Sequence, residues 1–177
     1  GKAVDVNSVL PDGGRLLPSG TDVMFDNRTH WMTDAEGGNY RVFAIDGSDA
    51  QRGDATGENM IERYCTGNFL AGQRLIYASA SGLPVGRYVF KAVVQKGADG
   101  GVIELFANDD RSPVTSVKVL RETEVATDVL DQDLTVGVES GLNNACQWVS
   151  FADVALEYQS PYMLLEEAVA ASDTLTY

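Results

Sequence analysis

Two aromatic residues, Trp31 and Tyr40, flank a loop at 33–39 that is rich in glycine and acidic side chains. An aromatic ring stacks on a sugar because the C–H groups of a pyranose meet the electron-rich face of the ring. Aromatic residues of β proteins also pack in the core, and the sequence around these two positions fits both roles. Trp31 and Tyr40 are therefore candidates either for a ligand platform or for the core.

Acidic side chains gather in three places, with glycine or asparagine nearby. The clusters are Asp46/Asp49/Asp54, Asn108/Asp109/Asp110 and Asp128/Asp131/Asp133. Closely spaced oxygen ligands suit Ca²⁺, although none of the clusters matches the calcium loop of EF-hands. Two carboxylates across a cleft would also suit a glycosidase, which needs a fixed separation that sequence spacing does not give. A structural calcium ion and a carboxylate-pair enzyme both remain open at this point.

The single histidine, His30, would have to be the base of any Ser–His–Asp hydrolase. No Gly-x-Ser-x-Gly sequence supplies the nucleophile of such an enzyme. A loop histidine beside a tryptophan fits a surface or packing role. We therefore expect no catalytic role for His30 and no hydrolase of this type.

The two cysteines, Cys65 and Cys146, each lie near the end of an expected strand. They would form a disulfide if the protein is exported and their Cα atoms lie within about 7 Å. The alternative is two separate buried thiols, which pack as small hydrophobic side chains. No basic residue adjoins either cysteine to activate it as a nucleophile.

Short segments of alternating apolar and polar residues run from residue 39 to residue 158, separated by clusters of Gly, Asp and Asn. This period of two, with β-branched and aromatic residues, is typical of strands. Many short strands without a long helix predict an all-β sandwich or barrel. The expected strands are 39–45, 59–65, 74–79, 86–96, 102–107, 115–120, 134–139 and 147–158, the last with a break or bulge near Ala152 and Asp153.

The segment 86–96 follows Leu-Pro-Val-Gly, a tight turn in which proline presets φ and glycine accepts a positive φ. A Gly-rich connection leads from this segment into 102–107, and the two predict a hairpin. Tyr88 and Phe90 should face the core, as should Trp148 and Phe151 at the start of the strongly apolar last strand. We expect Leu156 and Tyr158 of the last strand to pack against Tyr88 and Phe90 across about 10 Å of core.

The chain of 177 residues fits one domain, because domains cluster at roughly 100–150 residues. Lys and Arg number 13 and Asp and Glu 26, so the net charge is −13. This acidity argues against nucleic acid and anionic membranes as partners. With two Cys and one His, the count excludes a Cys/His zinc site. The composition indicates a soluble, acidic, monomeric domain that does not insert into a membrane.

The two ends of the chain differ from its middle. Residues 1–22 read as an extension, in which Gly1 is expected to be a remnant of an expression tag, and no signal peptide is visible. Residues 23–160 form the expected sandwich domain. Residues 161–177 carry apolar residues at helical spacing, which predicts a short C-terminal helix that docks on the domain or begins a further one.

Four segments, in chain order, resemble motifs of galactose-binding-like β-sandwich domains. The closing pattern, LTVGV at 134–138 and QWVSFADVALEY at 147–158, is similar to L-T-I-G followed by N-W-x-x-F-D-N-F-x-L-x-Y in those domains. NMIERY at 59–64, GLPVGRY at 82–88 and ELFAND at 104–109 are similar to N-x-I-E-x-W, G-L-P-x-G-x-Y and x-L-Y-A-N. The resemblance covers roughly residues 30–158 and departs at 151–154, where F-D-N-F is usual, and at Tyr64, where Trp is common.

Domains of this kind resemble carbohydrate-binding modules in exported proteins of polysaccharide-degrading gut bacteria. The resemblance implies a jelly-roll β-sandwich that binds a poly- or oligosaccharide without catalysis. In that case Trp31 and Tyr40 would stack on the sugar, with Asn108, Asp109 and Arg111 as polar partners.

The resemblance also implies a lipoprotein or other exported protein in the periplasm or on the cell surface, with neighbouring domains in the same chain. The alternative function is an adhesion or spacer domain that contacts proteins and binds no sugar. A large exposed apolar patch without an aromatic platform would favour that alternative.

Overall fold

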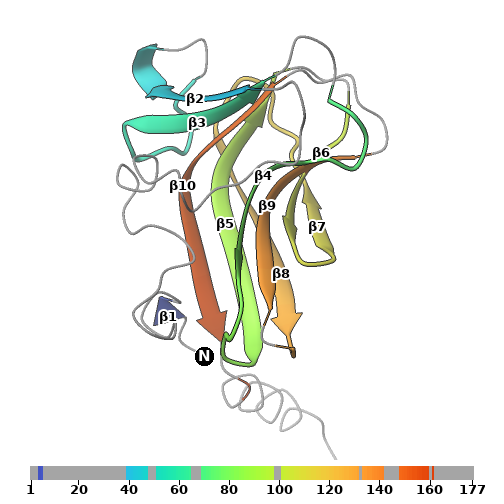
Figure 1. The fold of residues 1–177 in the computed structure, drawn as a ribbon. Helices are drawn as coiled ribbons and strands as arrows, with labels where there is room; N and C mark the ends of the chain where they lie inside the picture. Colours follow the sequence, from blue (N-terminus) through green and yellow to red (C-terminus); the bar gives the residue numbers. More distant parts are fainter. Residues whose placement is uncertain are drawn as a thin grey trace, which may run out of the picture.

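The computed structural model describes residues 4–5, 39–47, 51–64, 69–97, 101–131, 133–141, 148–159 and 161. Within them the chain forms two antiparallel sheets packed face to face, which confirms the expected all-β sandwich (Figure 1). The strands are β1 Val4–Asp5, β2 Asn39–Ala44, β3 Asn59–Tyr64, β4 Arg74–Ala80, β5 Gly86–Lys96, β6 Ile103–Ala107, β7 Asp110–Pro113, β8 Arg121–Val129, β9 Leu134–Ser140 and β10 Trp148–Gln159, and a short 3-10 helix, η4, spans Ile45–Gly47.

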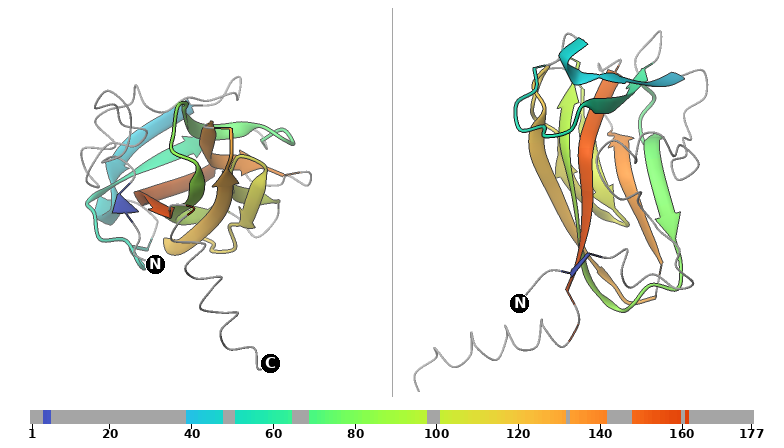
Figure 2. Two further views of the ribbon diagram at one scale, coloured as in Figure 1. Left: turned by 90° about the horizontal axis from the view of Figure 1, so that it is seen from below. Right: turned by 90° about the vertical axis from the view of Figure 1, so that its left-hand side faces the viewer.

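The chain changes sheet at most of its connections. The first sheet has the order β2-β3-β10-β5-β8, with β1 also paired to β10, and the second has the order β4-β9-β6-β7. From β3 to β6, and again from β7 to β10, each strand lies in the sheet opposite its predecessor. This alternation is that of a jelly roll, and Figure 2 shows the two layers edge-on.

The predicted hairpin between 86–96 and 102–107 is wrong. β5 pairs with β10 and β8 in the first sheet, whereas β6 pairs with β7 and β9 in the second. The Gly-rich connection therefore carries the chain across the sandwich instead of reversing it within one sheet. A turn signal in the sequence specifies a change of direction but not the sheet that the next strand joins.

Apolar side chains at every second strand position fill the space between the sheets. Tyr88 and Phe90 of β5 and Phe151 of β10 come from the first sheet, and Leu105 of β6 and Val136 of β9 come from the second, all with no measurable exposure. One buried face per sheet requires this period of two. The predicted core positions of Tyr88, Phe90 and Phe151 are confirmed.

The prediction that Leu156 and Tyr158 face Tyr88 and Phe90 across the core is wrong. β10 lies beside β5 in the same sheet, with Leu156 opposite Phe90 and Tyr158 opposite Tyr88. The two tyrosine rings are 5.1 Å apart between centroids. They are therefore a cross-strand pair, a contact that stabilises neighbouring strands within one sheet.

The tyrosine pair holds the turn that leads into β5. Tyr88 Oη donates to the carbonyl of Pro84 at 2.7 Å, and Tyr158 Oη donates to that of Val85 at 2.9 Å. Burial raises the pKa of the Tyr88 hydroxyl. Gly86 has φ +156°, and a Cβ there would lie 2.4 Å from the carbonyl oxygen of Gln159. The predicted Leu-Pro-Val-Gly turn is confirmed, and close approach of β10 is what requires its glycine.

The segment 115–120 is not a strand. It makes only isolated bridges, through Val117 and Val119, and Lys118 interrupts it with a left-handed φ of +57°. A strand, β8, begins at Arg121, directly after this segment. Neither β8 nor β7 was among the expected strands. Charged residues occupy most exposed positions of β8, so its apolar period is short and hard to see.

Several expectations fall at the ends of the chain. Residues 4–5 of the predicted N-terminal extension form β1 and pair with β10. The rest of 1–22 lies outside the described residues, as does the predicted C-terminal helix from residue 162 onward. Among the described residues, no helix is long and apolar enough to cross a membrane.

The predicted break in the last strand is a bulge at Asp153. The register of β10 against β5 shifts between Ala152 and Ala155, and Asp153 has a left-handed φ of +50°. Its carboxylate accepts hydrogen bonds from Thr56 N at 2.5 Å, Thr56 Oγ1 at 3.0 Å and Gly57 N at 3.1 Å. The bulge therefore directs one side chain out of the ladder to fasten the 51–58 loop to the first sheet.

Replacing Asp153 tests this fastening. Asp153→Ala removes all three acceptor contacts and leaves an alanine at a positive φ that no side-chain hydrogen bond offsets. We therefore expect a loss of about 1–3 kcal/mol in the free energy of unfolding. Asp153→Asn keeps a carbonyl acceptor and a residue type that tolerates this φ, and should lose clearly less. Urea unfolding of the three proteins measures the difference. Equal losses in both variants would contradict a hydrogen-bonding role.

A second carboxylate, that of Asp54, ties the same loop to β8. It accepts the backbone N–H of Glu122 at 3.0 Å and a guanidinium N–H of Arg121 at 3.2 Å. The backbone donor, more than the guanidinium, lowers the pKa of Asp54 below its ordinary value of 3.8. The ionised form of Asp54 is thus the form that the fold stabilises.

The pH dependence of stability follows from this direction. Because the pKa is lower in the folded state, the contribution of Asp54 is present above its ordinary value and is lost as the pH falls through the folded-state value. We expect the stability difference between the wild type and Asp54→Asn to be largest above pH ~5 and to shrink below pH ~4. Urea unfolding across this pH range tests it, and a difference that grows with acidity would show the opposite sign.

Candidate functional site

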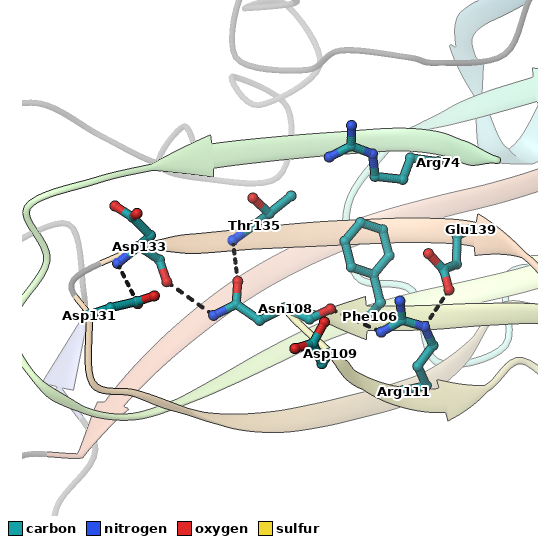
Figure 3. Close-up of a pocket in the computed structure, with 9 residues that line it drawn as sticks. All are labelled: Arg74, Phe106, Asn108, Asp109, Arg111, Asp131, Asp133, Thr135 and Glu139. Atoms are coloured by element: carbon teal, nitrogen blue, oxygen red, sulfur yellow. Dashed lines mark hydrogen bonds and ion pairs between the residues drawn. The ribbon is translucent and has the colours of Figure 1, made fainter. Parts of the chain in front are cut away.

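A cavity of about 390 Å³ lies on the outer face of the second sheet, away from the core. Ile103, Leu105 and Ala107 of β6 belong to the core, so Phe106 between them projects to the other face. We call this cavity the sheet pocket (Figure 3). Its lining residues are Arg74, Phe106, Asn108, Asp109, Arg111, Asp131, Asp133, Thr135 and Glu139.

Strand register brings these distant residues together. Phe106 lies opposite Arg111 of β7 on one side and Gly137 of β9 on the other. Glu139 of β9 lies opposite Arg74 of β4. Residues on one face of neighbouring strands are in contact range, so four segments of the chain share one surface.

The Arg111 side chain lies across the floor of the sheet pocket. Its guanidinium carbon is 5.5 Å from the centroid of the Phe106 ring, which is only 2% exposed. Arg111 Nε donates to Glu139 Oε1, and one Nη1 hydrogen bond reaches the carbonyl of Asn108 at 2.9 Å. Nη2 has no partner among the described residues, so its two N–H groups are left for a ligand or solvent.

Arg74 is held in a similar way at the edge of the same surface. Its guanidinium carbon lies 4.2 Å from the centroid of the Tyr77 ring, a cation–π geometry. Tyr77 is on β4 and lies opposite Gly137. Two arginines are therefore each placed on an aromatic ring, one on either side of β9.

Gly137 keeps the centre of this surface flat. A Cβ at this position would lie 2.1 Å from the carbonyl oxygen of Ile76 and 2.7 Å from the Cα of Tyr77. β4 comes this close because its register shifts between Arg74 and Ile76, at a bulge. The glycine is required for this close approach of β4 to β9.

Asn108 connects the β6–β7 turn to the start of β9. Its Nδ2 donates to the carbonyl of Asp133 at 3.0 Å, and its Oδ1 accepts the N–H of Thr135 at 2.9 Å. Its own N–H donates to the carbonyl of Thr135 at 2.8 Å. Asn108 has φ +50°, a left-handed conformation that asparagine tolerates. Its main role in the pocket is to position the surrounding backbone.

Asp131 and Asp133 lie at one end of the sheet pocket, and Asp109 lies between them and Arg111 (Figure 3). We call these three aspartates the acidic end. All three are exposed, and Asp131 Oδ1 accepts the N–H of Asp133 at 3.2 Å. Figure 3 shows Asp131 and Asp133 at the end opposite Arg74 and Glu139. No ion pair joins any of the three to a basic residue within the described part of the chain.

The structure brings together three of the five residues predicted to bind ligand. Asn108, Asp109 and Arg111 all line the sheet pocket. Tyr40 lies on β2 of the first sheet, which does not build the pocket, and its side chain lies outside the description. Trp31 lies outside the described residues.

Sequence reasoning missed Arg74, Phe106, Thr135 and Glu139 as pocket residues. Each occupies an outward position in a strand whose neighbours face the core. The expected strands 74–79, 102–107 and 134–139 already contained this alternation, so the outward face could be read from the sequence. Which strands lie side by side could not, because the pairings join segments far apart in the chain.

Other candidate residues carry no site in the described structure. His30, Cys65 and Cys146 lie outside the described residues, so the disulfide remains a prediction. Within the described ranges, no group of three or more acidic, His or Cys side chains is arranged to hold a metal ion. The acidic clusters therefore give the calcium expectation no support there. Trp148 is half-buried over Gly97 and not a core residue as predicted.

A second cavity, of about 280 Å³, lies on the outer face of the first sheet. Three of its four charged side chains, those of Lys91, Asp54 and Asp153, are engaged within the protein. Lys91 Nζ lies 3.0 Å from Glu157 and 3.8 Å from Glu124, and the bond to Glu157 raises the pKa of Lys91. Asp54 and Asp153, which also line it, fasten the 51–58 loop. These contacts give the cavity a structural explanation.

Comparison with known sequences gives no family. Neither a protein-family model nor a curated protein sequence matches the chain. Membership of a family is therefore not established by sequence.

Solved structures share the fold. The CBM22-1 xylan-binding domain of Xyn10C from Paenibacillus barcinonensis matches with a TM-score of 0.52 at 12% identity, over 80% of this chain and 90% of that one. The CBM22-1–CBM22-2 tandem domain of the same protein matches with 0.52 at 11%, over 75% and 41%. A putative sugar binding protein from Bacteroides thetaiotaomicron VPI-5482 matches with 0.50 at 13%, over 73% and 87%. The chain thus has the β-sandwich fold of carbohydrate-binding modules, which confirms the resemblance at the level of the fold.

Substitution of Asn108 tests its positioning role. Asn108→Ala loses both side-chain hydrogen bonds and puts alanine at positive φ, so we expect it to lose about 1–3 kcal/mol of unfolding free energy. Asn108→Gly loses the same hydrogen bonds without the backbone cost and should lose less. Urea unfolding separates the two effects. Two variants as stable as the wild type would show that Asn108 does not hold the turn.

Proposed function

We propose that this protein is a non-catalytic carbohydrate-binding domain that holds a short stretch of glycan in the sheet pocket. The observation that carries the proposal is the lining of this pocket, in which guanidinium donors and carboxylate acceptors surround one shared space. Ligand pockets commonly occupy about 300–1,000 Å³, so a volume near 390 Å³ suits a few sugar units at most.

Sugars match this mixture of groups because each hydroxyl both donates and accepts hydrogen bonds. Arg111 offers the N–H groups of Nη2, and Asp109 offers acceptor oxygens nearby. Phe106 lies beneath the Arg111 guanidinium and supports it from below. Since Arg111 is already held by Glu139 and by the Asn108 carbonyl, binding would cost little further side-chain ordering.

The fold supports the same function. The Paenibacillus domain with this fold is described as xylan-binding, and the Bacteroides protein as a putative sugar binding protein. Identities of 12% and 13% carry the fold but not the ligand, so the glycan class has to come from the pocket.

The exposure of the pocket acids supports a non-catalytic role. A glycosidase needs one carboxyl group that stays protonated, usually in an apolar environment, and a second carboxylate across the cleft. Asp109, Asp131 and Asp133 are all exposed to solvent. Glu139, the most buried acid of the pocket, is paired with Arg111.

No specific observation favours an adhesion or spacer domain. The exposed large hydrophobic residues among those described are Leu70, Val85, Val102 and Leu130. They lie on four different connections between strands, and single exposed apolar residues are ordinary on soluble proteins.

The proposal extends to the setting of the domain. A glycan partner suits an exported protein in the periplasm or on the cell surface, as a monomer beside other domains of its chain. Stacking by Tyr40 would take place on the first sheet, apart from the sheet pocket.

Affinity electrophoresis in gels that contain a panel of soluble polysaccharides tests the proposal. We expect the migration of the wild type to be retarded by at least one of them. Arg111→Ala removes the donor on the pocket floor and uncovers Phe106, so affinity should fall by about tenfold or more, the effect of about 1.4 kcal/mol.

A matched control is Arg87→Ala, on the outer face of the first sheet. Arg87 is also an exposed arginine in an ion pair, with Asp128 at 2.9 Å. It lies on β5 of the first sheet, whereas the strands that build the pocket belong to the second sheet. The control variant should be retarded like the wild type. No retardation of the wild type by any polysaccharide would sink the proposed function, and equal weakening by both substitutions would remove the sheet pocket as its site.

A further inference from the structure

The charges of the sheet pocket are unevenly distributed along it. The lining has four carboxylates, of Asp109, Asp131, Asp133 and Glu139, and two guanidinium groups, of Arg74 and Arg111. Glu139 is neutralised locally by its ion pair with Arg111. The three aspartates at the acidic end have no ion pair with a described basic residue, so the negative charge remains at that end.

Two hydrogen bonds tie part of the acidic end to its surroundings. Asp131 Oδ1 accepts the N–H of Asp133, and the carbonyl of Asp133 accepts from Asn108 Nδ2. The backbone at Asp133 is therefore tied to the β6–β7 turn, which carries Asp109.

We infer that the sheet pocket selects glycans by charge, accepting uncharged sugar units and rejecting units that carry a carboxylate or a sulfate at the acidic end. This inference rests on the proposed function. An uncharged sugar hydroxyl donates a hydrogen bond to an aspartate, whereas an anionic substituent offers no donor and is repelled. Asp109, Asp131 and Asp133 are then specificity-determining residues.

The repulsion acts at short range and depends on salt. Charges on a surface are felt over about 8 Å at physiological ionic strength and about 3 Å at 1 M salt. An anionic group on a bound sugar would lie within the first distance. Rejection should therefore be strong in dilute buffer and weaken as salt is added, unlike a rejection caused by shape.

The test uses pairs of polysaccharides that differ in charge. Suitable pairs are hydroxyethyl cellulose with carboxymethyl cellulose, carboxyl-reduced with native polygalacturonate, and xylan with sulfated xylan. We expect the wild type to bind the neutral member of at least one pair. Its affinity for the charged partner should be lower by about tenfold or more, and this difference should narrow at high salt.

A triple variant assigns the rejection to the acidic end. Asp109→Asn/Asp131→Asn/Asp133→Asn keeps an acceptor oxygen at each position and removes three charges, so the charged polysaccharide should gain affinity and close the gap. The control is Glu122→Gln/Glu124→Gln/Asp128→Asn on β8, which removes the same charge from the outer face of the opposite sheet. It should leave the gap open.

The outcomes separate this inference from the function on which it rests. Binding to none of the six polysaccharides would overturn the proposed function and the selectivity with it. Equal or tighter binding of the charged members by the wild type would leave glycan binding intact and refute the selectivity. A gap that closes to the same extent in both triple variants would assign the rejection to the net charge of the protein and also refute it.

Discussion

Burial of apolar side chains between the two sheets is the constraint on which the rest of the described structure depends. It commits every second residue of a strand to the core, as Leu105 and Ala107 of β6 illustrate. Only the alternate residues remain for other tasks, and on the second sheet these are the residues that line the sheet pocket. Because their neighbours are packed into the core, the backbone beneath the pocket is fixed.

Side chains that fasten backbone segments complete this arrangement on both faces. Asp153 ties a loop to the first sheet, and Asn108 ties two turns together at the second. Both residues adopt a positive φ, a conformation that Asn and Asp tolerate better than most residues. In each case a local backbone cost places a polar side chain where it can satisfy buried or turn N–H groups. The pocket therefore needs little reorganisation to receive a ligand, which favours affinity.

The positions of the strands could be predicted from the sequence better than the pairing between them. Alternation located seven of the eight expected strands, and the bulge near Asp153 followed from the length of the last one. It failed at β8, where charged outward residues hide a short apolar period. Pairing was beyond reach because β10 lies between β3 and β5, and because the strands after β5 and β7 change sheet. The grouping of the pocket residues could not be predicted for the same reason, since Arg74 and Glu139 are neighbours only through strand register.

The acidic end gathers three carboxylates of a protein with a net charge of −13 in one pocket. Four acidic residues elsewhere on the described surface are paired with basic ones: Asp46 with Arg52, Asp54 with Arg121, Asp128 with Arg87 and Glu157 with Lys91. Asp109, Asp131 and Asp133 have no such pair among the described residues. Since salt screens charges beyond about 8 Å, these three dominate what a ligand in the pocket experiences. Whatever binds there has to satisfy acceptors at one end and fixed arginine donors at the other, a demand that hydroxyl groups meet and anions do not.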